Sequence, residues 1–167
     1  LAVLYGLSYT IKMSKMDGSQ PQGYFDYVVP PLEGLWWMEK REGFDGIHIT
    51  DKSCFCWTSM IGLPSFVTRQ VLEQAKEKLH KKNPDLDLSH ARMETLTEGL
   101  CAQIMHLGPY DGEPGTIRQM QAFLEAEGYI TDINETRKHH EIYFNDPRKT
   151  APEKLKTIIR HPVKIRI

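Results

Sequence analysis

The ten residues from Arg137 to Asp146 alternate in character, and this alternation restricts the fold more than any other stretch. A β-strand points successive side chains to opposite faces, so a strand here has two different faces. One face carries His139, Glu141 and Tyr143, and the other carries His140, Ile142 and Phe144. The turn signal Asn145-Asp146-Pro147 ends the strand. The pattern fits two structures equally well: an edge strand with a solvated polar face, or a strand that holds one carboxylate between an imidazole and a phenol.

The rest of the chain mixes helix-like and strand-like segments. We predict helices at 1–13, from a Ser65 N-cap to Asn83-Pro84, and from Gly108-Pro109-Tyr110-Asp111 to Gly128. We predict further strands at 24–29, 34–38, 54–61, 93–97, 100–107 and 155–163, a charged loop at 39–46, and a helical turn at Thr150-Ala151-Pro152-Glu153. Because the order lacks a strict strand-helix-strand alternation, we expect an α+β fold, with an antiparallel sheet and helices on one side.

The length, net charge and cysteine count of the chain limit its classes of function. The length of 167 residues fits one domain or two very small ones, and we expect a single domain, 1–167. The net charge of −1 gives no excess of basic residues for nucleic acid. No apolar segment is long enough to span a membrane. The three cysteines match no zinc or redox spacing, which favours reduced thiols and a cytoplasmic protein. Because Leu1 falls inside an apolar run, we expect that an N-terminal piece is absent from the chain.

The candidate site is aromatic and acidic. The sequence contains no phosphate-binding loop and no nucleophile elbow, and we expect neither a cofactor nor a metal. His139 and His140 are adjacent and cannot share a strand face, which argues against zinc. The aromatic residues Tyr27, Trp36, Trp37, Trp57, Tyr110 and Tyr143 are either core residues or the lining of a pocket. Rings around one carboxylate suit flat apolar or cationic ligands, and an enclosed carboxyl with a raised pKa is a general acid or base. Only one of Trp36 and Trp37 can face inward.

Several blocks of the sequence, taken together in this order, resemble the GyrI-like small-molecule-binding domain. The blocks are Tyr27-Val28-Val29-Pro30-Pro31-Leu32-Glu33-Gly34-Leu35-Trp36-Trp37, Glu98-Gly99-Leu100-Cys101, Gly108-Pro109-Tyr110-Asp111, Glu127-Gly128-Tyr129, and His139-His140-Glu141-Ile142-Tyr143 with Asp146 to Thr157. The longer blocks resemble the stand-alone members of the family. The resemblance covers essentially the whole chain.

The resemblance implies two strand-helix-strand-strand (SHS2) modules, at about 1–80 and 85–167, related by a pseudo-twofold axis with a ligand cleft between them. It also implies that the first strand precedes Leu1, and it places the acidic pocket residue at Glu141. Family members act as ligand sensors in transcription regulators, as gyrase-binding proteins, and as stand-alone proteins that bind drug-like molecules. One stand-alone subfamily hydrolyses the cyclopropane ring of DNA-alkylating natural products.

Our leading hypothesis is a stand-alone protein that captures flat lipophilic or cationic xenobiotics and hydrolyses a strained electrophile among them. Glu141 and Tyr143 are its candidate catalytic residues, and the aromatic residues named above are its candidate ligand-binding residues. The first alternative is a sequestering or sensor module without chemistry, so enzymatic activity stays open. A gyrase-interacting protein ranks third. The expected partner is a small molecule rather than nucleic acid, a membrane or another protein.

Overall fold

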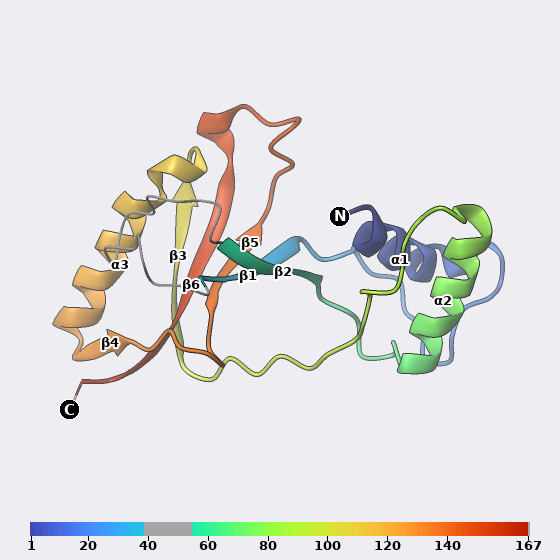
Figure 1. Cartoon of the computed structure of the whole chain (residues 1–167), viewed down its shortest axis with the longest axis horizontal. Helices are drawn as coiled ribbons and strands as arrows, with labels where there is room; N and C mark the ends of the chain where they lie inside the picture. Colours follow the sequence, from blue (N-terminus) through green and yellow to red (C-terminus); the bar gives the residue numbers. More distant parts are fainter. Residues whose placement is uncertain (39–54, 167) are drawn as a thin grey trace. The chain divides into compact units, whose positions relative to one another are not determined.

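The computed structural model describes residues 1–38 and 55–166, and an open antiparallel sheet organises its larger part (Figure 1). The helices are α1 (Ala2–Lys12), α2 (Arg69–Lys82) and α3 (Glu113–Ala126). The strands are β1 (Leu32–Met38), β2 (Phe55–Ile61), β3 (Cys101–Leu107), β4 (Tyr129–Thr131), β5 (His139–Tyr143) and β6 (Lys156–Ile165). The described residues also form the short 3-10 helices η1 (Met13–Met16), η3 (Tyr110–Gly112) and η4 (Pro152–Lys154). The sheet order is β2-β1-β5-β6-β3, with β4 also paired to β6. This arrangement confirms the predicted α+β class.

The described chain divides into two compact units. The helical unit comprises Leu1–Pro31 and Met60–Leu96, and the sheet unit comprises the remaining described residues. Each unit therefore draws on two separate stretches of sequence. The division into modules at 1–80 and 85–167 stays a prediction.

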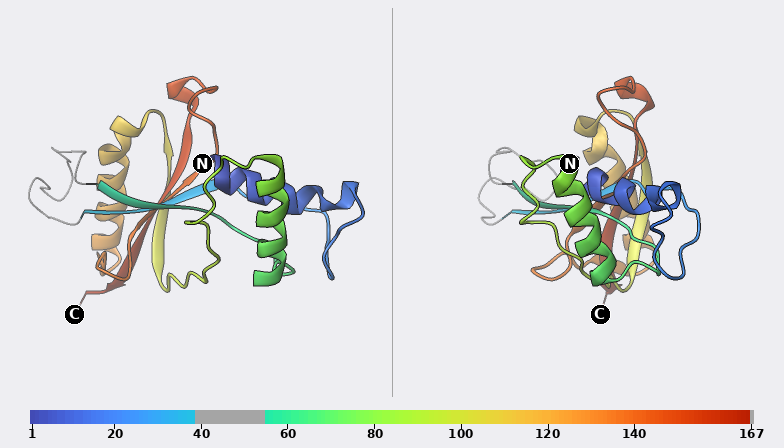
Figure 2. Two further views of the ribbon diagram at one scale, coloured as in Figure 1. Left: turned by 45° about the vertical axis from the view of Figure 1, so that its right-hand side comes forward. Right: turned by 90° about the vertical axis from the view of Figure 1, so that its right-hand side faces the viewer.

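In the helical unit, α1 and α2 pack against each other (Figure 2). Their shared core contains Leu7, Ile11, Leu72 and Leu79, together with Phe66 and Val67 from the segment that precedes α2. The predicted N-cap at Ser65 is wrong, because the cap is Thr68, whose side chain accepts a hydrogen bond from the Val71 N–H. Phe66 and Val67 lie in the core, and α2 begins after them at Arg69.

Two predicted strands are wrong. Residues 24–29 have no regular structure, because the ring of Tyr24 packs against Phe66 and its hydroxyl donates to the Lys12 carbonyl oxygen. Their aromatic composition therefore serves the helical core rather than a sheet. Residues 93–97 are also irregular.

The remaining elements follow the prediction closely. The sequence did not predict the short strand β4, whereas the helical turn near Thr150 is confirmed as η4. The predicted loop at 39–46 and the residue Cys54 lie outside the described residues.

In the sheet unit, α3 lies against β3 and β4 (Figure 1). The buried residues Met120 and Leu124 of α3 contact Ile159 and Val163 of β6. Pro114 in the first turn of α3 and Gly128 after its end, with a φ of 75°, favour these helix boundaries. This packing fixes one face of the sheet as the face toward α3. Among the described residues, no helix combines the length and the apolar character of a membrane span.

We predict that Leu124→Ala lowers the free energy of unfolding by roughly 2–5 kcal/mol, because it leaves a cavity between α3 and β6. Leu124 is 3% exposed, whereas its neighbour Phe123 is 59% exposed. Phe123→Ala is the matched control and should cost about 1 kcal/mol or less. Urea unfolding measures both variants, and equal losses would contradict this packing.

Candidate functional site

The site centres on Glu141, in the middle strand of the sheet. Strand pairing places Glu141 opposite Gly34 of β1 and opposite Ile159 of β6. Directly paired residues of antiparallel strands point to the same face, and Ile159 lies in the core under α3. Glu141 therefore lies on the α3 face of the sheet. The predicted alternation is confirmed, since His140 and Ile142 of the other face are both buried.

The carboxylate of Glu141 contacts two neighbours of its own strand. The Tyr143 hydroxyl donates to Glu141 Oε2 at 2.6 Å, and His139 Nε2 lies 2.7 Å from Glu141 Oε1. The side chain of Glu141 is only 12% exposed. Burial raises the pKa of Tyr143, and the negative charge of Glu141 raises it further, so this phenol keeps its proton. Both oxygens of the carboxylate are thus held in place.

Gly34 allows Trp36 to join this group. The Trp36 Nε1–H donates to the Tyr143 hydroxyl oxygen at 2.8 Å, directly over Gly34. A Cβ atom at position 34 would lie 2.8 Å from Trp36 Nε1, closer than carbon packs, and 3.2 Å from the Tyr143 oxygen, which is a tight contact. A glycine is therefore needed at this position.

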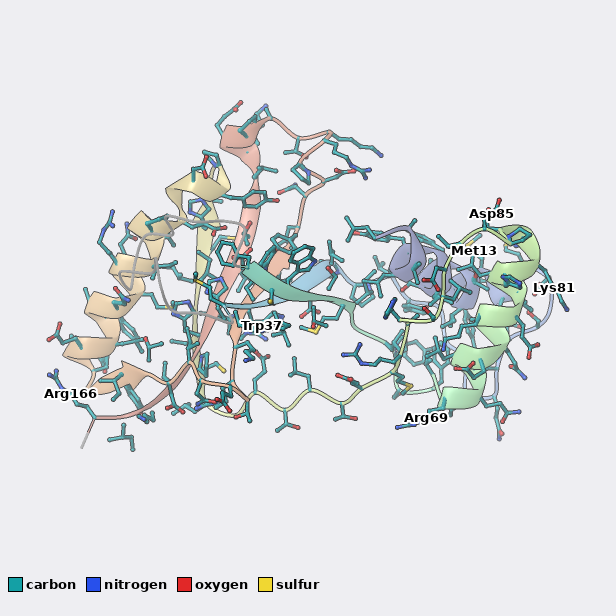
Figure 3. The ribbon with its side chains drawn as sticks, viewed as in Figure 1. Met13, Trp37, Arg69, Lys81, Asp85 and Arg166 are labelled. Atoms are coloured by element: carbon teal, nitrogen blue, oxygen red, sulfur yellow. The ribbon has the colours of Figure 1, made fainter. Side chains whose placement is uncertain are left out.

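The tryptophan pair divides between the two faces. Trp36 pairs with His139 in the register and so faces α3, whereas Trp37 points to the opposite face. There the Lys138 ammonium lies 5.1 Å from the centre of the Trp37 ring; Figure 3 labels Trp37 among the side chains. The structure therefore separates Trp37 from the Glu141 group.

Two further predicted residues do lie beside the Glu141 group. The ring of Trp57 stacks on Trp36 with a centroid distance of 5.7 Å, and the ring of Tyr110 meets Tyr143 edge-on at 6.0 Å. Trp57 is 58% exposed, so its ring presents a broad apolar surface. A planar ligand could stack there in place of water.

Tyr27 belongs to the helical unit. Its ring packs against Tyr24 and Phe66, and the Lys12 ammonium lies 5.4 Å from its centre. Burial raises the pKa of Tyr27. These contacts give Tyr27 a packing role within its own unit.

Glu113 is a functional candidate that sequence reasoning missed. Its Oε1 atom is buried and has no hydrogen-bond partner within the described residues. Burial raises the pKa of Glu113 to about 8, and the negative charges of Glu141 and Asp111 act in the same direction. The raised pKa expected of an enclosed carboxyl is thus found on Glu113. The clue available in the sequence was an acid that comes directly after a strand and its turn.

A second polar cluster occupies the opposite face. His140 Nε2 lies 2.8 Å from Glu33, and His140 Nδ1 lies 2.8 Å from Glu98, which also binds Arg160. Burial opposes a charge on His140, but the hydrogen bonds and charges of the two acids outweigh it and raise its pKa. This cluster joins β1, β5 and β6 and is structural. In residues 1–38 and 55–166 no three His, Cys, Asp or Glu side chains are grouped to hold a metal ion.

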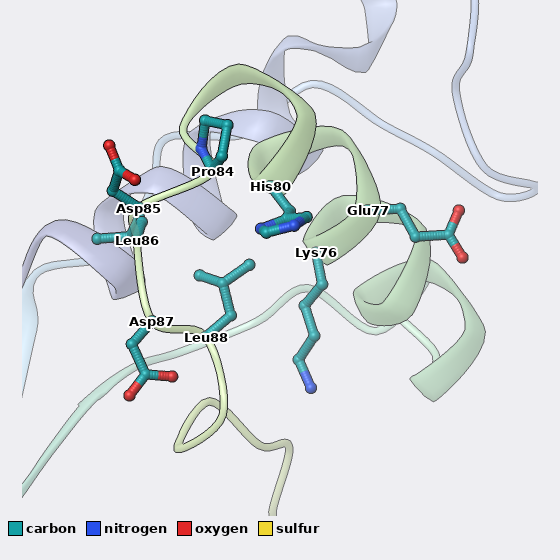
Figure 4. Close-up of a pocket in the computed structure, with 8 residues that line it drawn as sticks. All are labelled: Lys76, Glu77, His80, Pro84, Asp85, Leu86, Asp87 and Leu88. Carbon is teal, nitrogen blue, oxygen red and sulfur yellow. The ribbon is translucent and has the colours of Figure 1, made fainter.

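The helical unit has a hollow of its own, with a volume of about 560 Å³ (Figure 4). Its lining comes from the end of α2 and the segment after it: Lys76, Glu77, His80, Pro84, Asp85, Leu86, Asp87 and Leu88. The charged groups around it are mostly exposed, and no aromatic ring lines it apart from His80. The hollow lacks the enclosed carboxylate and the stacked aromatic rings of the Glu141 group. We therefore take the Glu141 group as the candidate site.

One family model matches the chain, and solved structures resemble it. The sequence profile of the GyrI-like small molecule binding domain matches residues 8–164. An uncharacterized conserved protein from Listeria innocua has a similar structure, with a TM-score of 0.89 and 49% identity over 97% of this chain and 77% of that chain. A structure described as a hydrolase from Listeria innocua has a TM-score of 0.86 and 47% identity, over 97% of this chain and 76% of that chain. No curated protein matches significantly.

The titration of Glu113 makes stability depend on pH. Its pKa rises from 4.5 to about 8 on folding, so the folded chain holds this proton more tightly than the unfolded chain. The stability that Glu113 contributes is complete below its unfolded pKa and is lost as the pH rises through its folded pKa. Between about pH 5 and pH 9 we expect Glu113→Gln to gain stability relative to the wild type as the pH rises.

Urea unfolding over this pH range measures the difference. The control is Glu125→Gln, also on α3, where the carboxylate is 75% exposed. Its difference from the wild type should stay nearly constant. A constant difference for Glu113→Gln as well would show that Glu113 titrates normally.

Proposed function

The chain belongs to the GyrI-like small-molecule-binding family, and from this premise we propose that it captures flat lipophilic or cationic molecules and hydrolyses a strained electrophile among them. Cyclopropane-containing alkylating compounds are the substrate class that we favour. The Listeria innocua structure described as a hydrolase, which is 47% identical to this chain, supports a hydrolytic rather than a purely binding role.

One observation carries this proposal: two neighbouring acids have environments that separate their protonation states. Glu141 accepts a hydrogen bond from Tyr143 and faces the His139 imidazole, which favours a carboxylate. Glu113 has a buried oxygen without a partner and a pKa of about 8, which favours a neutral acid near pH 7. A pair of carboxyl groups divided in this way can supply a base and an acid together.

The proposed reaction adds one water molecule to the substrate. Glu141 takes a proton from the water while the water oxygen attacks a carbon of the strained ring. The carbon–carbon bond of the ring breaks, and its electron pair moves through the conjugated system to the carbonyl oxygen. Glu113 gives its proton to that oxygen, so the product contains the substrate and one water. Glu141 then releases its proton to solvent, and Glu113 takes up a proton from solvent.

The aromatic residues hold the substrate in this scheme. Trp36 and Trp57 form a stacked pair beside the acids, and Tyr110 lies against Tyr143. The hydroxyl of Tyr143 already donates to Glu141. Tyr110 is therefore the better candidate to donate a hydrogen bond to the oxygen on which charge develops.

The test of chemistry uses a spirocyclopropyl cyclohexadienone, because its ring opening by water yields a phenol that is easily measured. We expect the wild type to form the water-added product over many turnovers. We expect Glu141→Gln to lower kcat by about 10²–10⁴-fold while binding changes little, because it removes the base. The control Glu125→Gln, with its exposed carboxylate, should behave as the wild type. Bound but unchanged dienone with the wild type would instead identify a sequestering module.

The test of binding compares tryptophans on opposite faces of the sheet. We expect Trp57→Ala to weaken the binding of ethidium, a planar cation, by about 5–10-fold, since stacking on an aromatic ring contributes about 1 kcal/mol. Trp37→Ala is the control, because Trp37 contacts Lys138 on the other face. Fluorescence titration measures both affinities. A loss for Trp37→Ala as large as for Trp57→Ala would place the ligand elsewhere.

A further inference from the structure

Behind Glu141 lies a pair of histidines that the proposed reaction does not use. His139 Nδ1 is 2.7 Å from His161 Nε2, and the two rings meet edge-on with centroids 4.8 Å apart. His161 is on β6 and is 5% exposed. Its second nitrogen, Nδ1, is buried and finds no partner in the described parts of the chain.

These contacts restrict where the protons lie. Burial lowers the pKa of His161 to about 3, and the neighbouring His139 adds to the effect, so His161 is neutral and carries one N–H. If that proton is on Nε2, it donates to His139 Nδ1, and the unpaired Nδ1 of His161 is a lone pair. If it is on Nδ1, a buried N–H has no acceptor, which is the costlier defect.

The first arrangement also settles the state of His139. A neutral His139 that accepts at Nδ1 must carry its own proton on Nε2, where it faces Glu141 Oε1 at 2.7 Å. The donors then run in one direction, from His161 to His139 to Glu141. The Trp36 indole and the Tyr143 hydroxyl form a second directed chain that ends on the other oxygen of Glu141.

We propose that the His139–His161 pair decides which of the two acids holds the proton: it aims a neutral N–H at Glu141, keeps that carboxylate ionised, and leaves the proton on Glu113. His139 is thus a positioning residue that acts through Glu141. The consequence for turnover rests on the proposed function, whereas the proton placement does not.

The other ionisable groups around the two acids agree with this role. From η3 the charge of Asp111 opposes ionisation of Glu113, and burial raises the pKa of Tyr110, so Tyr110 is neutral. On β5, Tyr143 keeps its proton. The β1 residues that pair with this face of β5 are Leu32, Gly34 and Trp36, and none of them carries a charge. His139 and Tyr143 are therefore the two side chains that bond to the Glu141 carboxylate from β5, and only His139 is linked through His161 to β6.

The experiment compares His139→Leu with His139→Gln. Leucine removes the donor, whereas the glutamine amide retains an N–H near the position of Nε2. The readout is the carboxyl ¹³C signal of Glu113 and Glu141, assigned with Glu→Gln variants and followed against pH. In His139→Leu we expect the titration midpoint of Glu113 to fall from about 8 by roughly one pH unit, and the Glu141 signal to move toward the protonated form at pH 7. In His139→Gln both signals should stay at their wild-type positions.

A second measurement uses the wild-type chain and so does not depend on whether a variant folds. Imidazole ¹⁵N spectra should show the proton on Nε2 of both His139 and His161 and a lone pair on Nδ1 of each. A proton on His139 Nδ1, or a His139→Leu variant with unchanged carboxyl titrations, would overturn the proposal. If the wild type fails to open the dienone while both measurements come out as expected, the proposed function fails and this inference stands.

Discussion

The hydrogen bonds that converge on Glu141 are the interaction on which the rest of the site depends. They come from residues of three strands, because His161 on β6 and Trp36 on β1 act through His139 and Tyr143 on β5. The antiparallel register brings these strands together, and α3 completes the site by presenting Glu113 at its first turn. A shift of β5 by one residue would turn Glu141 away and bring His140 in its place.

The opposite face of the same strands explains how the register is held. His140 joins Glu33 of β1 to Glu98, and Glu98 in turn binds Arg160 of β6. His140 is 1% exposed, so this ionic cluster is largely desolvated and tolerates little displacement. Two opposing effects act on the pKa of Glu98. Burial raises it, but the contacts with His140 and Arg160 lower it overall. β5 therefore carries a structural cluster on one face and the candidate site on the other.

The sequence predicted the parts that depend on local periodicity. The two-residue period of β5 predicted that His139, Glu141 and Tyr143 share one face, and in the structure His139 and Tyr143 both bond to Glu141 there. Adjacent strand positions predicted that Trp36 and Trp37 separate, but the side of each depends on pairing with a distant strand. The raised pKa of Glu113 could not be predicted from the sequence, because it depends on burial and on charges from other segments. The predicted strand at 24–29 is wrong, because packing against the helical core overrode the strand composition of these residues.

The central claim is that Glu141 and Glu113 are in opposite protonation states at neutral pH, and this division allows one site to supply both a base and an acid. Neutron diffraction from a deuterium-exchanged crystal near pH 7 tests it most directly, because it locates each exchangeable proton. The account predicts deuterium on the Glu113 carboxyl group and on His139 Nε2, and none on Glu141. Deuterium on Glu141 with an ionised Glu113 would contradict it.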